Sequence, residues 1–134
     1  MSRRLSSAIA ILCLLFSGSI YFLFRSTDMY MFLPIKACGG MDKLNDIRSL
    51  FADCHLPDWF LYSLPDGLWL YAYMLFIRSL WNTGNSNLKT LFLLLLPTLA
   101  FTFEALQFLS LYQGTGDVVD VIFYILFIAL YLIF

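Results

Sequence analysis

Four polar side chains lie in or beside long apolar stretches, and these are the residues whose chemistry is easiest to interpret. They are Asp66, Glu104, Gln107 and Asp120. Carboxylates bind cations and ammonium groups, and an amide both donates and accepts hydrogen bonds. Ionisable residues are costly inside a bilayer and usually have a function there. We therefore predict that these four residues form a ligand-binding site, with no catalytic residue assigned.

The spacing of these residues predicts that they meet at one level. Glu104 and Gln107 are three residues apart, so they share one face of a helix. Glu104 precedes the end of its apolar stretch by seven residues, which corresponds to a depth of about 10 Å. Asp66 and Asp120 each lie near the start of another stretch. Three separate segments thus bring acids to one face of the membrane.

Each acid also has a purely structural explanation. Asp66 directly follows Pro65, and both are favourable in the first turn of a helix. Asp117 and Asp120 lie at the start of a predicted helix, where negative charge is favourable, and Asp117 is also a good helix cap. Glu104 could be a protonated acid bonded to a neighbouring helix.

The sequence contains few other chemical signals. It has no glycine-rich phosphate loop, no His-Glu-x-x-His and no Gly-x-Ser-x-Gly. The single histidine, His55, has no paired nucleophile, and no Cys/His spacing suggests zinc. We expect no metal site and no cofactor. The lack of a clear nucleophile or base favours a protein that is not an enzyme, but the sequence leaves this question open.

The composition indicates an integral membrane protein. Of 134 residues, 61% are hydrophobic and 13% are charged, whereas a soluble domain has about 25% charged residues. This excludes a soluble globule, a disordered tail and a secreted disulfide scaffold. The net charge of −1 argues against nucleic acid as a partner. The length corresponds to a single domain, residues 1–134.

Four apolar stretches can position the polar residues, at about 5–24, 65–81, 88–111 and 118–134. About 20 helical residues cross the hydrocarbon core of a bilayer. We predict an all-α membrane protein with four transmembrane helices. The first stretch could instead be a cleaved signal peptide, but its apolar run continues past Ser19 and favours an uncleaved anchor.

The distribution of Lys and Arg predicts the orientation. Arg3 and Arg4 precede the first stretch, while the long segment 25–64 holds five acids and four bases. By the positive-inside rule, both termini are cytoplasmic and segment 25–64 lies outside, in the plasma (bacterial inner) membrane. Apolar residues recur every three or four positions over about 41–54, which predicts an amphipathic helix in this extracytoplasmic loop.

Two cysteines, Cys38 and Cys54, flank that amphipathic segment. In an oxidising compartment they could form a disulfide that closes a loop of about 17 residues and stabilises the fold by about 3 kcal/mol. The alternative is two free thiols.

The motifs resemble those of the VanZ-like family of small membrane proteins. The runs that match are Ser63-Leu-Pro-Asp66, Glu104-Ala-Leu-Gln107 and Gly116-Asp-Val-Val-Asp120, within residues 63–127. The resemblance implies a four-helix membrane fold. The founding member of the family is associated with resistance to the glycopeptide teicoplanin, without a settled biochemical activity.

The chain also departs from the family pattern. The family's Lys and His after the aspartate correspond to Gly67 and Leu70, and its later Asn corresponds to Tyr124. Its loop arginine is replaced by the run that begins at Gln113.

Three functions remain open from the sequence. The first is a membrane protein whose outward-facing acidic and polar pocket binds a cationic or lipid-linked ligand of the cell envelope. The second is a metal-dependent membrane hydrolase or transferase, in which Asp66, Glu104 and Asp120 hold Mg²⁺ or Mn²⁺. The third is a structural subunit packed through its helices. The partners expected are the lipid bilayer and such a ligand, and an oligomer is compatible with the sequence.

Overall fold

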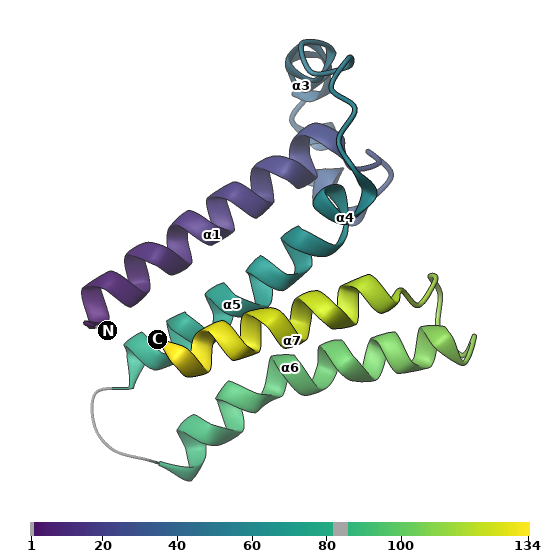
Figure 1. Ribbon diagram of the computed structural model, residues 1–134. Coiled ribbons are helices and arrows are strands. Elements are labelled where there is room, and N and C mark those ends of the chain that lie inside the picture. Colours follow the sequence, from purple (N-terminus) through teal and green to yellow (C-terminus); the bar gives the residue numbers. More distant parts are fainter. Residues whose placement is uncertain (1, 82–85) are drawn as a thin grey trace.

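The computed structural model describes residues 2–81 and 86–134, and within these ranges the chain is helical, without strands. Its long helices are α1 (Arg3–Phe24), α5 (Ser63–Leu80), α6 (Asn87–Phe108) and α7 (Val118–Ile133) (Figure 1). The shorter elements are η1 (Tyr30–Phe32), α2 (Leu33–Ala37), α3 (Met41–Ser49) and α4 (Asp58–Leu61).

Helix α5 is the centre of the arrangement, because α1, α6 and α7 all pack against it. Both termini lie at one end of the long helices, and α3, α4 and the α6–α7 loop lie at the other end (Figure 1). We call the latter the loop end. Residues 82–85 of the predicted connection between the second and third stretches lie outside the described residues.

Three helical segments are long and apolar enough to cross a membrane: Arg3–Phe24, Asp58–Leu80 and Asn87–Phe108. The fourth apolar helix, α7, is shorter, with 16 residues. Large apolar side chains on these helices are exposed, among them Leu12, Leu15, Leu91 and Ile125. Contiguous exposed apolar surface of this kind is typical of helices that face lipid.

Small residues allow α1 to approach α5 closely. Ser6, Ala10 and Ser17 on α1 are fully or almost fully buried, and Ala10 packs with Ala72 and Leu75 of α5. Small residues at such spacings are typical of helix pairs in membranes, where van der Waals packing replaces the hydrophobic effect. The buried Ser17 hydroxyl donates to the Cys13 carbonyl, 2.8 Å away, so its polar atom is satisfied within the helix.

Helix α6 ends at Phe108, three residues before the end of the apolar stretch at Leu111. Ser110 adopts a positive φ of 57°, and the Leu111 amide donates to the Leu106 carbonyl at 2.8 Å. The Ser110 amide donates to the carbonyl of Gln107, which completes a Schellman motif. Apolar composition therefore overestimates the length of this helix, because the backbone turns while the side chains remain apolar.

Helix α3 covers the first part of the predicted amphipathic segment and ends at Ser49, and residues 50–53 form turns. Arg48 joins α3 to the end of α1: its guanidinium donates to the carbonyls of Arg25 at 2.8 Å and Phe22 at 3.3 Å. These carbonyls lack partners within α1, so a cation there is favourable. This contact fixes the position of α3 relative to the end of α1.

Cys38 and Cys54 are both exposed and are free thiols in the structure. The disulfide between them stays a prediction for the protein in an oxidising compartment.

Candidate functional site

A cavity of about 1000 Å³ lies at the loop end, between the ends of the long helices. All four polar residues singled out by the sequence, Asp66, Glu104, Gln107 and Asp120, line it. They come from three helices, α5, α6 and α7. Further polar and aromatic residues complete the lining, including Arg25, Asp58, Trp59, Tyr62 and Asp117.

Glu104 is the most buried acid of the cavity, with 7% of its surface exposed. Its Oε2 accepts a hydrogen bond from the backbone N–H of Asp117, 3.1 Å away. Asp117 is the N-cap of α7, and its own side chain accepts from the Val119 amide at 2.8 Å. Glu104 therefore joins α6 to the start of α7, where the helix dipole favours negative charge.

Gln107 fixes the loop between α6 and α7. Its Nε2 donates to the Gln113 carbonyl at 3.2 Å. Gly114 follows with φ of 122°, and a Cβ built there would lie 2.6 Å from Gln107 Nε2. Only glycine fits this conformation and this space, so the loop can close over the amide.

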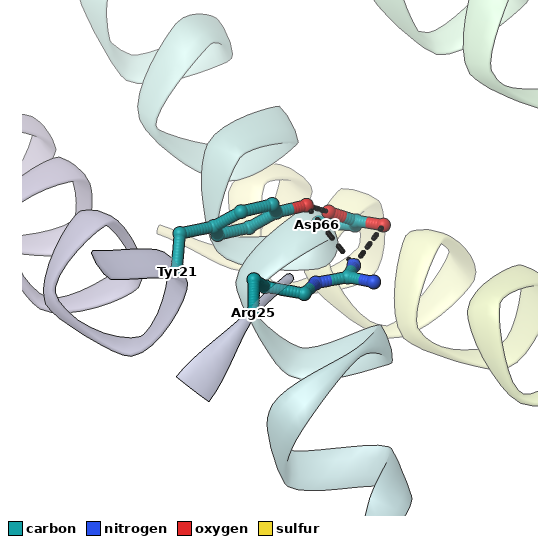
Figure 2. A network of polar contacts seen from close by, with 3 residues as sticks. All are labelled: Tyr21, Arg25 and Asp66. Carbon is teal, nitrogen blue, oxygen red and sulfur yellow. Dashed lines mark hydrogen bonds and ion pairs between the residues drawn. The ribbon is translucent and has the colours of Figure 1, made fainter. Parts of the chain in front are cut away.

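Asp66 is held by two residues from the end of α1 (Figure 2). The Tyr21 hydroxyl donates to Asp66 Oδ1, and the Arg25 guanidinium lies 3.9 Å from Oδ2. The same guanidinium also donates to the Tyr21 oxygen at 3.3 Å. Asp66 is thus a member of a three-residue network between α1 and α5, in addition to being a residue of the first helical turn.

Arg25 is a residue of the cavity lining that the sequence analysis did not single out. Its guanidinium carbon lies 4.7 Å from the centroid of the Tyr21 ring and 4.4 Å from that of Tyr62, which are cation–π distances. Its Nε is buried and has no hydrogen-bond partner among the described residues. The i, i+4 spacing of Tyr21 and Arg25 was the available signal.

Asp120 lies in the first turn of α7, and its Oδ1 is buried without a hydrogen-bond partner in the described part of the chain. A buried acceptor without a partner is costly, so a donor from a ligand or a water would be favourable there. The lining as a whole carries five carboxylates and one guanidinium, and the acids in addition to those predicted are Asp58 and Asp117.

Gly67 places α5 directly against α7. A Cβ at this position would lie 2.5 Å from Cδ2 and 2.8 Å from Cε2 of Phe127. A larger side chain, such as the lysine of the VanZ-like pattern, has no space here. The glycine thus sets the distance between the helices that carry Asp66 and Asp120.

The carboxylates are not arranged as a metal centre. Within residues 2–81 and 86–134, no three His, Cys, Asp or Glu side chains are grouped closely enough to hold a metal ion. The cavity therefore offers separate acids, Asp66, Glu104 and Asp120, on three different helices.

Comparison of the chain with models of protein families, with curated protein sequences and with solved structures gives no match.

Proposed function

We propose that the protein spans the plasma membrane with four helices, with both termini in the cytoplasm, and binds a cationic or lipid-linked envelope ligand in the cavity at the loop end. The observation that carries this proposal is the cavity itself, in which five carboxylates and one guanidinium surround about 1000 Å³. Helix α3 would then lie at the outer surface of the plasma membrane. Both termini lie at the same end of the long helices (Figure 1), which supports the proposed topology.

The charge balance of the cavity favours a cation. Arg25 already faces Asp66, so Glu104 and Asp120 are the acids available to a ligand. An ammonium group has three donors, and the carboxylates of Glu104 and Asp120, which line the cavity, are acceptors for them. A hydrogen bond to a charged group contributes about 1.5–3 kcal/mol, which corresponds to about 10- to 150-fold in affinity.

Arg25 adds a second recognition element. Its guanidinium group is partly exposed and lines the cavity, so it could donate to an anionic part of a ligand that also carries an ammonium group. We also propose that the chain is a divergent member of the VanZ-like family. In that case Arg25, which directly follows α1, would supply the positive charge that the family places on its second helix.

The alternative functions receive less support. A structural subunit would pair its acids internally, yet the Asp120 Oδ1 has no partner in the described residues. A hydrolase that uses metal would need its ligand side chains close enough to share one ion, and no such group of three is found in the described part of the chain.

Trp59 lines the cavity and gives a direct test of binding by fluorescence. The protein in detergent is titrated with glycerophosphoethanolamine, which carries an ammonium and a phosphate, and with glycerol phosphate, which carries the phosphate alone. We expect saturable binding of the first and none of the second. Glu104→Gln should weaken binding at least 10-fold, because the amide keeps the size and the acceptor but loses the charge.

The matched control is Arg78→Gln, which also replaces a charged residue with glutamine. Arg78 lies in the last turn of α5, about 18 Å from Asp66 along the helix. This variant should bind as the wild type does. Equal binding of both probes, or unchanged binding in Glu104→Gln, would contradict the proposal.

A further inference from the structure

We infer that the ligand is an aminolipid, with its ammonium group beside Glu104 and Asp120 and part of one hydrocarbon chain in an apolar cavity below them. This inference rests on the proposed function. It adds that the ligand has a chain, and that the ligand reaches the site from within the bilayer.

The evidence begins with a second, smaller cavity that adjoins the polar one. It has a volume of about 160 Å³ and shares Asp66 with the polar cavity. The rest of its lining is apolar or aromatic: Trp69, Leu70, Leu96, Ala100 and Tyr124. These residues come from α5, α6 and α7, the helices that carry the acids. We call this space the apolar cavity.

The two cavities are stacked along the helix axis. Ala100 and Leu96 precede Glu104 by four and eight residues on α6, which corresponds to depths of about 6 and 12 Å below it. The direction is from the loop end toward the middle of the helices (Figure 1). A lipid in a bilayer has the same arrangement, with a polar head at the surface and its chain directed toward the centre.

The surroundings of the apolar cavity explain how a chain could enter. On α6, Leu95 and Leu99 are exposed beside the lining residues Leu96 and Ala100. Of the three helical segments long enough to cross a membrane, α6 is the least buried inside the fold. A chain could therefore pass from surrounding lipid over this face without crossing a polar surface.

The charged side chains that line the polar cavity favour one class of lipid head group. An anionic phospholipid would bring only negative charge to a lining with five carboxylates. A zwitterionic aminolipid brings an ammonium for Glu104 and Asp120, and its phosphate can approach the partly exposed guanidinium of Arg25 in the same lining. Phosphatidylethanolamine is the simplest lipid with this chemistry.

The test compares a lipid with its chainless head group. Wild-type protein in detergent is titrated with dioleoyl-phosphatidylethanolamine, dioleoyl-phosphatidylglycerol and glycerophosphoethanolamine. We expect the first lipid to bind at least 10-fold more tightly than glycerophosphoethanolamine, and phosphatidylglycerol not to compete. Ala100→Phe fills the apolar cavity, so it should weaken binding of the lipid at least 10-fold and leave the affinity for glycerophosphoethanolamine unchanged.

Ala129→Phe is the matched control, because Ala129 is exposed on α7 and lines neither cavity. It should bind both probes as the wild type does. Retained binding of the chainless head group in Ala100→Phe also reports that this variant is folded. If Ala100→Phe does not fold, Leu96→Phe replaces it with the same expectation.

The outcomes separate the two proposals. If neither ethanolamine probe binds the wild type, the proposed function fails and this inference fails with it. If glycerophosphoethanolamine binds as tightly as the diacyl lipid, or if Ala100→Phe weakens both probes equally, the chain site is wrong while the proposed function stands. Competition by phosphatidylglycerol would show that the head-group assignment is wrong.

Discussion

Replacing Gly67 with alanine should destabilise the protein, although the same change in most helices is favourable. The added Cβ would lie 2.5 Å from Phe127 Cδ2 and 3.3 Å from Phe123 Cβ. Phe127 is only 8% exposed, so its ring has little open space into which to move. Overpacking of this kind costs about 1–3 kcal/mol. The higher helix propensity of alanine offsets about 1 kcal/mol of this cost, which leaves a net loss of about 1 kcal/mol.

Gly18→Ala is the control for this prediction. Gly18 also lies in a membrane-length helix, α1, but a Cβ there would meet no atom within 4 Å. This variant should gain up to about 1 kcal/mol from helix propensity alone. The free energy of unfolding is measured in detergent by titration with sodium dodecyl sulfate, followed by circular dichroism. The two variants should differ by about 2 kcal/mol. If Gly67→Ala is as stable as Gly18→Ala, the close packing of α5 on α7 is wrong.

Three further predictions concern the α1–α5 network and the segment 25–64. Tyr21→Phe removes the hydroxyl that donates to Asp66. Because the Asp66 side chain is 31% exposed, we expect the free energy of unfolding to fall by about 1 kcal/mol in the same titration. An unchanged free energy of unfolding would refute the hydrogen bond. An impermeant maleimide added to intact, reduced cells should label Cys38 but not a cysteine introduced at Asn85, and the reverse pattern would invert the topology. In protein purified from an oxidising envelope, mass spectrometry without reduction should find Cys38 and Cys54 joined, and free alkylation of both would exclude the bridge.

Much of the candidate site could be predicted from the sequence, because it depends on helical geometry that counting residues reproduces. The three-residue spacing of Glu104 and Gln107 places them on one helix face. Asp66 and Asp120 lie near the starts of their helices, and this position predicts their level in the fold. All four do line one cavity. The all-helical class followed from composition in the same way.

The remaining features depend on tertiary contacts or backbone conformation. Arg25 becomes part of the site only because α1 packs on α5 and brings the guanidinium to Asp66. The end of α6 was missed because Ser110, in place of the usual glycine, adopts the left-handed conformation. The importance of Gly67 lies in its distance to Phe127, which no spacing in the sequence reveals.

The most direct measurement of the central claim, that the cavity around Glu104 holds a cationic ligand, is native mass spectrometry of protein extracted gently from its own membrane. The wild type and Arg78→Gln should each carry one bound molecule that contains a primary amine. Glu104→Gln should lose it while keeping the same circular dichroism spectrum, because only the charge is removed. Glu104→Gln protein that carries the same molecule at the same occupancy would contradict the account.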